Sequence, residues 1–317
     1  MISKVLQIIF YPGILFIFCL GFFFEWVDRK FFARLQSRYG PMYTGRWGLF
    51  QPLADFIKLL SKEDIEHSYV DKYTFKLVPL VLLALPLTAI MCIPFNNMEA
   101  PIFSFEGDII FILFVMTMNA VLTFIAGWAS TNRFGIIGGI RTALQLLGYE
   151  IPLTIAFTGP VILAKTLSIK ELVAWQATNL PFILLQPVGF GVTVICLMAE
   201  LELVPFDIPK AETEIVAGWM TEFSGRKLAL IRLSKNVKLV LASSLLASVY
   251  LAGPSGLLPT LSVLWFLVKV FCVVLVFSVL RACFARFRID QMLGGAWKYL
   301  LPIALIQVLL TLPFQVS

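Results

Sequence analysis

The sequence predicts an all-α integral membrane protein of about eight transmembrane helices, with amphipathic surface helices in its cytoplasmic loops. Of its 317 residues, 59% are hydrophobic and only 14% are charged, a composition well outside the range of soluble globular domains. Apolar runs of roughly 17 to 25 residues, the length that crosses a bilayer as a helix, recur along the whole chain. We therefore expect a single membrane domain over 1–317.

The predicted spans follow from these apolar runs. They lie near 5–24, 77–95, 109–129, 142–164, 181–199, 230–252, 261–280 and 299–315. Charged residues from Glu25 to Lys30 follow the first span without a small-residue cleavage site, so we expect this span to be retained as an anchor. Pro187, Gly189 and Gly191 predict that the fifth span is broken or closely packed.

The basic residues predict the orientation, because Lys and Arg accumulate in cytoplasmic loops. The loops 25–76, 130–141, 200–238 and 281–298 hold 21 of the 25 Lys and Arg residues. We therefore expect a multi-pass protein of the cell membrane with both termini outside. Because this bias accounts for the net charge of +6, the charge predicts no nucleic-acid partner.

The metal-binding side chains are few. The five cysteines lie mostly within predicted spans and show no CxxC spacing, and His67 is the one histidine. Iron–sulfur clusters, zinc sites and haem need several Cys or His ligands in suitable positions. We therefore expect neither a metal nor a cofactor in this chain, so that any redox centre belongs to another subunit.

The first cytoplasmic loop, 25–76, contains a predicted surface helix. Between Gln51 and Lys62, apolar residues recur at helical spacing, and Asp55 and Lys58 occupy the other side. One interpretation is a helix lying at the membrane surface. The other is that this loop, together with 200–227, docks a soluble subunit. The candidate docking residues are Asp55, Lys58, Arg34 and Arg38.

Glu150 is the principal candidate for an ion pathway inside the membrane. A carboxylate near the bilayer centre costs about 2.5 to 3.5 kcal/mol, so such residues face the protein interior and usually serve ion movement. Pro152 interrupts the helical hydrogen bonds beside it. The alternative is a protonated Glu150 that only bonds to a neighbouring helix. In the preceding span, Asn119 and Thr123 are expected to bond between helices.

A second candidate site is the stretch from 200 to 222. It holds six carboxylates, Glu200, Glu202, Asp207, Glu212, Glu214 and Glu222. Apolar residues accompany each acid, which predicts partial burial and carboxyl pKa values raised towards proton exchange. The alternative is a solvated acidic loop.

Proline fixes the expected local structure of this stretch. Pro205 and Pro209 exclude one continuous helix, so we expect an irregular link and then a short helix that begins near Pro209. On that helix, one face would carry Glu214, Gly218 and Glu222, and the adjacent apolar stripe would carry Ile215, Trp219 and Phe223.

Two basic features complete the candidates. Lys269, inside the predicted seventh span, is assigned to an ion pathway or to a contact with a neighbouring membrane subunit; the alternative is snorkelling or bonding to main-chain carbonyls. In the loop 281–298, Arg281, Arg286 and Arg288 are consistent with binding of anionic lipid or of a partner's acidic edge.

Three motifs together resemble a known family. They are GPMYTGRWGLFQPLADFIKLLSKED, QLLGYEIPL and AELELVPFDIPKAETEIVAGWMTEFSG. In this order and spacing, over about 28–238, they resemble the heel subunit (subunit 1, or H-type) of respiratory complex I and its relatives in membrane-bound hydrogenase complexes. The matching acidic positions are Glu150, Glu200, Asp207, Glu212, Glu214, Glu222 and Asp55.

The resemblance implies a non-redox membrane subunit of a multisubunit oxidoreductase. Such a subunit anchors the peripheral redox arm, and its buried carboxylates couple electron transfer to translocation of H⁺ or Na⁺. The implied partners are hydrogenase-like or complex I-like peripheral subunits, including an Fe–S subunit, and antiporter-like membrane subunits. The implied cofactors, a [NiFe] or related metal centre and Fe–S clusters, belong to the partners.

Three departures bear on the branch of the family. Leu203 stands at a position that is usually arginine in the quinone-reducing branch, and Lys210 and Lys235 stand where that branch usually has acids. These changes favour a ferredoxin-linked membrane-bound [NiFe] hydrogenase or a sulfur-reducing complex. The first alternative is the quinone-binding subunit of NADH dehydrogenase. The second is a stand-alone ion-coupled transporter, which should purify without partners.

Overall fold

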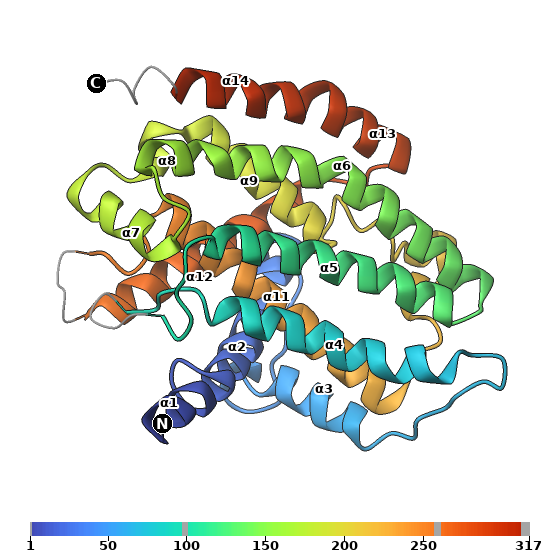
Figure 1. Cartoon of the computed structure of the whole chain (residues 1–317). Helices are drawn as coiled ribbons and strands as arrows, with labels where there is room; N and C mark the ends of the chain where they lie inside the picture. Colours follow the sequence, from blue (N-terminus) through green and yellow to red (C-terminus); the bar gives the residue numbers. More distant parts are fainter. Residues whose placement is uncertain (1, 97–100, 257–260, 312–317) are drawn as a thin grey trace.

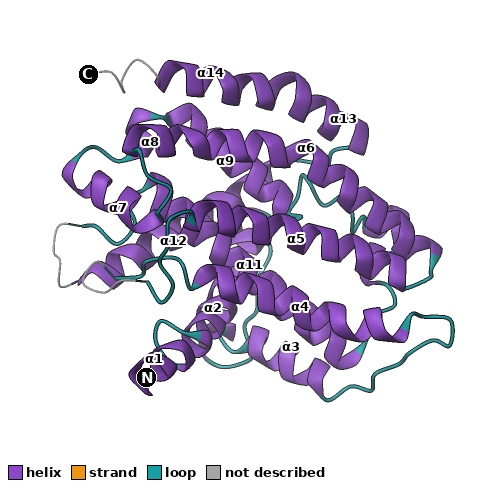
Figure 2. Cartoon of the chain, in the orientation of Figure 1, coloured by secondary structure: helices purple, strands orange, loops and turns teal. Residues whose placement is uncertain are grey.

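The computed structural model describes residues 2–96, 101–256 and 261–311. These residues form helices joined by loops and contain no strand (Figure 2). The predicted all-α class is therefore confirmed. The long elements are α2 (Ile14–Leu35), α4 (Lys72–Ile90), α5 (Asp108–Ala129), α6 (Arg133–Ala164), α9 (Pro187–Glu200), α11 (Gly225–Tyr250), α12 (Ser262–Cys283) and α14 (Leu301–Thr311). The short elements are α1 (Ile2–Ile9), η1 (Arg46–Gly48), α3 (Gln51–Leu60), α7 (Ile169–Thr178), α8 (Phe182–Leu185), α10 (Glu212–Ile215), η2 (Gly218–Met220), α13 (Ile289–Gly295) and η4 (Ala296–Leu300).

Among the described residues, six helical segments are long and apolar enough to cross a membrane. They are Leu6–Leu35, Lys72–Ile90, Asp108–Ala129, Arg133–Ala164, Ser262–Cys283 and Ile289–Thr311. The predicted fifth span corresponds to α9, which has only 14 residues. The predicted sixth span lies in α11, which is 26 residues long but carries five Lys and Arg residues from its start to Lys238. The total of eight spans therefore remains a prediction.

Helix α11 runs through the middle of the bundle (Figure 1). It packs against α4, α2 and α12, and its second half is buried on all sides. Small residues such as Ser243, Ser244 and Ser248, none of them exposed, permit this close approach of neighbouring helices. The basic first half of α11 thereby lies beside the link between α9 and α10 (residues 201–211).

The ends of the helices define two sides of the bundle. Helices α1 and α7 and the far end of α14 lie on one side (left in Figure 1), and the loops 61–71 and 130–132 lie on the other. The second of these sides is the one predicted to be cytoplasmic. Which side faces the cytoplasm stays a prediction.

The fifth apolar segment is interrupted as its sequence predicts. Gln186 separates α8 from α9 with a non-helical backbone (φ −135°, ψ 60°), and Pro187 opens α9. Gln307 of α14 donates a hydrogen bond to the Gln186 side chain at 2.9 Å. A Cβ atom on Gly189 would lie 2.3 Å from the Gln307 amide, so a larger residue there would displace this side chain from its place between α9 and α14.

The prediction of one short helix that begins near Pro209 is wrong. The chain forms only α10 and then η2, because Val216 adopts φ 60° and ends the first element. Gly218 also has a positive φ, and a Cβ there would lie 1.8 Å from the Pro209 carbonyl oxygen. The apolar stripe is nevertheless buried, with Ile215, Trp219 and Phe223 each no more than 4% exposed.

Candidate functional site

A polar cavity of about 240 Å³ lies where α2, α11 and α12 meet the link between α9 and α10. We call it the acid–base cavity. Its ionisable lining residues are Glu25, Asp28, Glu202, Asp207, Lys210, Lys235 and Arg281. The fold brings these residues together because the link folds back over the basic first half of α11.

Glu202 and Lys210 form a buried ion pair in this cavity. Burial would raise the pKa of the Glu202 carboxyl, but the charges of Lys210, Lys235 and Lys238 outweigh burial and lower it below its ordinary value. Burial likewise opposes the charged form of Lys210, and the nearby carboxylates reverse the effect and raise its pKa. Both partners are therefore charged at neutral pH.

Asp207 titrates differently from Glu202. Burial raises the pKa of its carboxyl, and the neighbouring Lys210 only partly offsets that effect. The charge of Glu202 raises it further. Two carboxyl groups with opposite pKa shifts therefore share one cavity, so a change in the charge of one changes the proton affinity of the other.

Lys235 has a different environment from Lys210. Its Nζ lies 2.8 Å from Met220 Sδ and 5.1 Å from the centre of the Trp219 ring. Lys235 and Glu202 also line a second cavity of about 30 Å³, which is large enough for one water molecule. These two side chains, with Leu201, therefore line both the acid–base cavity and this smaller space.

A second ion pair lies further inside. Glu200, at the end of α9, is 2% exposed, and its Oε1 lies 2.8 Å from Lys238 Nζ. The Tyr149 hydroxyl donates to the other carboxylate oxygen of Glu200. Because Tyr149 precedes Glu150 in α6, this hydrogen bond brings the two glutamates close to each other.

Glu150 lies within α6 and faces α5. Thr117 donates to its Oε1 at 2.6 Å. Its Oε2 is buried and has no hydrogen-bond partner within the described part of the chain. A buried oxygen with no protein partner is available to a water molecule or a proton. Asn119 of α5 donates to the Leu82 carbonyl at 3.2 Å, which confirms the predicted bond between helices for this residue. The same prediction is wrong for Thr123, which donates to the Asn119 carbonyl within α5 at 2.7 Å.

The remaining predicted acids lie outside this interior group. Glu212 is exposed. Glu214 is 46% exposed and pairs with Arg141 and Arg286, which lower the pKa of its carboxyl. Glu222 bonds to Asn132 and lies 2.9 Å from His67 Nε2. The predicted common face of Glu214 and Glu222 is wrong, because the chain bends at Val216 between them.

Lys269 is separate from the acids. It donates to the main-chain carbonyls of Gly253 and Ser255 at 2.8 and 2.6 Å. These bonds hold the loop after α11, at the opposite end of α12 from Arg281. The geometry matches the alternative interpretation, in which this lysine bonds to the backbone.

The predicted surface helix is present as α3. Asp55 lies 2.7 Å from Arg29 NH1 and accepts from Gln51 at 2.9 Å. Burial would raise the pKa of the Asp55 carboxyl, and these hydrogen bonds lower it instead. The other three candidate docking residues, Arg34, Arg38 and Lys58, are exposed. Asp55 therefore holds α3 against α2 while the three cations remain accessible.

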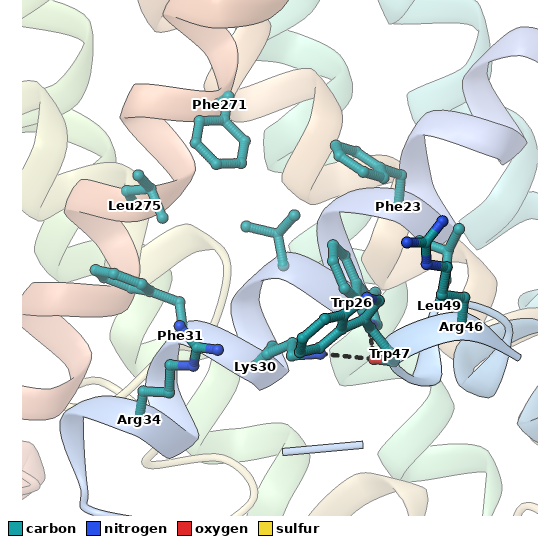
Figure 3. Close-up of a pocket in the computed structure, with 11 residues that line it drawn as sticks. Phe23, Trp26, Lys30, Phe31, Arg34, Arg46, Trp47, Leu49, Phe271 and Leu275 are labelled. Carbon is teal, nitrogen blue, oxygen red and sulfur yellow. Dashed lines mark hydrogen bonds between the residues drawn. The ribbon is translucent and has the colours of Figure 1, made fainter. Parts of the chain in front are cut away.

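A larger space than the acid–base cavity lies between α2, η1 and α12 (Figure 3). We call it the α2–α12 groove. It has a volume of about 620 Å³ and is lined mainly by apolar residues, among them Phe23, Phe271 and Leu275. Lys30 donates to the Trp47 carbonyl at 2.7 Å. Its Nζ lies 5.1 Å from the Trp26 ring and 5.2 Å from the Trp47 ring. Together with Lys30, the groove is bordered by two further cations, Arg34 and Arg46.

Sequence reasoning did not assign Tyr149, Thr117, Lys238, Glu25 or Asp28 to the site. The sequence did carry a signal for Glu25 and Asp28, because acids that follow directly after a predicted span are candidates for a polar site. Tyr149 and Thr117 carry no such signal, since a hydroxyl residue in a span is usually a packing or hydrogen-bonding residue.

The fold and this site define a multi-pass helical membrane protein with a connected set of buried ionisable residues. A family model described as "NADH dehydrogenase" matches residues 6–312. The chain therefore belongs to the family of H-type (subunit 1) membrane subunits of complex I-like oxidoreductase complexes, as the three motifs indicate.

Curated relatives agree with this family. The chain is 39% identical over 289 residues to the H-type subunit of NADH-quinone oxidoreductase from Dehalococcoides mccartyi, covering 91% of this chain and 80% of the relative. It is 37% identical over 295 residues to the second H-type subunit of NADH-quinone oxidoreductase from Syntrophobacter fumaroxidans, covering 90% and 88%. It is 36% identical to the second H-type subunit of the same enzyme from Rhizobium meliloti, covering 90% of each chain. None of these three relatives supports the predicted hydrogenase or sulfur-reductase branch.

Proposed function

We propose that this chain is the quinone-facing membrane subunit of an NADH-quinone oxidoreductase, in which it couples electron transfer to ion translocation. The observation that carries the coupling role is the continuous set of buried ionisable side chains from the acid–base cavity to Glu150. The quinone and NADH assignments rest on the names of the relatives.

The coupling would begin at the acid–base cavity. Redox chemistry on the cytoplasmic side changes a charge or moves a loop next to the link, and Glu202 and Asp207 respond because their titrations are coupled. A change at Glu202 alters the field on the neighbouring lysines. Lys238 then holds Glu200 more or less tightly, and Tyr149 transmits the change towards Glu150. Antiporter-like membrane subunits would receive the ion or the conformational change from there.

The surface around α3 would hold the peripheral arm. Its exposed cations are Lys58 on α3 and, at the adjacent end of α2, Arg34 and Arg38, and Asp55 ties the two helices together. Polar contacts also join the loop 25–76 to the stretch 200–227. Asp64 accepts from the Arg226 amide at 2.7 Å, and Glu66 pairs with Lys227. A docked Fe–S subunit would therefore contact a surface that is mechanically connected to the acidic stretch.

Glu150→Gln tests the coupling role. The substitution keeps the size and the Thr117 hydrogen bond but removes the titrating group. We expect ion pumping by the complex in proteoliposomes to be abolished, with the complex still assembled. Glu171→Gln, the same chemical change at an exposed position on α7, serves as the control and should pump normally. Ion pumping that is retained in the Glu150→Gln complex would contradict the proposed coupling role.

The second candidate function is the membrane-bound hydrogenase or sulfur-reductase branch. The observation that favours it is the presence of Lys210 and Lys235 at the acid–base cavity, where the quinone-reducing branch usually has acids. Mass spectrometry and metal analysis of the complex that co-purifies with this chain distinguish the two. Nickel together with iron assigns the hydrogenase branch, whereas iron without nickel, with bound quinone and a nucleotide-binding flavoprotein, supports the quinone reductase.

A further inference from the structure

An apolar cavity of about 570 Å³ lies at the opposite end of α9 from the acid–base cavity. Its walls come from α7, from the break between α8 and α9, and from the last turns of α14, and they include Trp175, Val188 and Ile306. Helix α14 packs against α6 and α9 here, at the top of Figure 1. We call this space the α9–α14 cavity.

Two buried glutamines line this cavity and keep unpaired polar groups. Gln186 and Gln307 are 3% and 4% exposed. One hydrogen bond joins them, from Gln307 Nε2 to Gln186 Oε1. Gln186 Nε2 and Gln307 Oε1 have no hydrogen-bond partner among the residues that the structure describes. Because unpaired buried polar groups are costly, the site calls for a molecule that supplies one acceptor and one donor.

Two glycines give the glutamine pair a fixed position. A Cβ atom on Gly159 of α6 would lie 2.4 Å from Gln307 Nε2 and 2.6 Å from Gln186 Oε1, and Gly189 of α9 is equally close to the Gln307 amide. The two amides therefore pack directly against the backbones of α6 and α9. The unpaired donor and acceptor are thus permanent features of the cavity.

The cavity lies at the depth of a membrane interface. Gln186 precedes α9, and the 14 residues of that helix place it about 21 Å from Glu200. Helix α7, which contributes Trp175, lies on the side of the bundle opposite the loop 61–71 (Figure 1). Tryptophan is enriched where hydrocarbon meets the polar headgroups. The ester groups of membrane lipids lie at this same depth.

We propose that the α9–α14 cavity binds one glycerolipid of the membrane. One acyl chain fills the apolar part, and an ester carbonyl oxygen accepts a hydrogen bond from Gln186 Nε2. A hydroxyl group of the same lipid is the donor for Gln307 Oε1. The described lining contains no charged side chain, so the site recognises the glycerol region and not the charge of the headgroup.

The size and opening of the cavity favour a lipid over a helix of a neighbouring subunit. A helix with its side chains is about 10–12 Å across, so this volume corresponds to only about one turn. Val188 and Ile306 are exposed, so the cavity opens towards the surroundings of the bundle, which an acyl chain can enter. Because lipid tails are as apolar as these walls, the preference for one bound lipid comes from the hydrogen bonds.

The first test locates the lipid. The complex is reconstituted in phosphatidylglycerol vesicles that contain a small fraction of the same lipid with a diazirine in one acyl chain. Light releases N₂, and the carbene that remains inserts into a nearby C–H bond, so that mass spectrometry finds the labelled residues. We expect label on Val188 and on the cavity side of α14.

A matched pair of variants shows whether the label reports the cavity. Ile306→Trp fills it and should remove most of the label on Val188. Leu309→Trp introduces the same ring at another exposed position of α14 that does not line the cavity, so this control should label as the wild type does.

The second test examines the hydrogen bond from Gln186. Unlabelled diester phosphatidylglycerol competes with the probe, and so does its diether analogue, which lacks the carbonyl oxygens. We expect the diester to compete roughly twofold to tenfold better, which is the value of one hydrogen bond. In Gln186→Leu the two lipids should compete equally. If this variant does not assemble, the comparison in the wild-type complex still decides.

Three results would overturn the proposal. The first is label spread evenly over the lipid-facing helices and unchanged by Ile306→Trp. The second is a cavity without label in the assembled complex, which would show that a neighbouring subunit covers it. The third is equal competition by the two lipids in the wild type. None of these readouts uses electron transfer, so they are independent of the proposed quinone reductase function.

Discussion

The two halves of the acidic stretch have similar compositions and opposite environments. Glu200 and Glu202 are buried and pair with lysines, Lys238 and Lys210. Glu214 lies half exposed and pairs with arginines, and Glu222, whose own side chain is 16% exposed, contacts Asn132 and the exposed His67. The stretch is therefore an interior site followed by a surface site.

The difference arises from where the backbone turns and from which helix lies opposite. The link directly after α9 folds over α11, whose basic first half supplies Lys235 and Lys238 on the side that faces the link. Further along, Glu214 before the bend at Val216 pairs with Arg286 of the segment 281–298, and Glu222 after the bend contacts His67 of the loop 61–71. Carboxylates of the same type therefore serve either a buried charge network or the attachment of loops.

The largest effect is expected at the buried half. Lys238→Met removes one partner of a buried ion pair and leaves the Glu200 charge uncompensated, which costs about 3–5 kcal/mol. Thermal denaturation of the purified complex should show a large fall in Tm. Adding Glu200→Gln to Lys238→Met should recover much of the loss, because the pair is then removed as a whole. A fall no larger than that of Lys58→Met, on the exposed side of α3, would contradict the interior assignment.

A smaller effect, with a definite pH dependence, is expected at Lys210. The folded-state pKa of Glu202 is lowered from its ordinary value of 4.5, so its contribution to stability is present above that value and is lost as pH falls through the folded pKa. Lys210→Met removes the strongest of the opposing charges and raises the folded pKa of Glu202. The part of the stability loss on acidification that comes from Glu202 should then be smaller than in the wild type, because the gap between its unfolded and folded pKa values narrows. Thermal denaturation across a pH series measures this pH dependence, and curves that stay parallel to the wild type would show that Lys210 does not control Glu202.

The helical architecture was accessible from the sequence because hydrophobic length and proline position act locally. The break at Pro187 and the helix at Gln51–Leu60 both followed from residues within one or two turns. The extent of α9 did not, because the backbone at Gln186 depends on the packing of α14 against Gly189.

The sequence predicted the acidic residues of the candidate site but not the residues that pair with them. Glu150, Glu200 and Glu202 were recognisable because acids are rare in an apolar chain. Lys238 and Tyr149 were not, because only the fold brings α11 and α6 to the end of α9. The bend at Val216 was also hidden, since a β-branched residue with positive φ is held by its tertiary surroundings and not by its own preference.

The smallest effect is expected at the exposed half of the stretch. Glu214→Gln removes two ion pairs with Arg141 and Arg286, but solvent screens them, so we expect a loss of stability below about 1 kcal/mol. The loss should shrink further in high salt, because exposed charges are screened within a Debye length. Thermal denaturation at low and high ionic strength measures both. A large, salt-independent loss would place Glu214 with the buried acids and remove the distinction between the two halves.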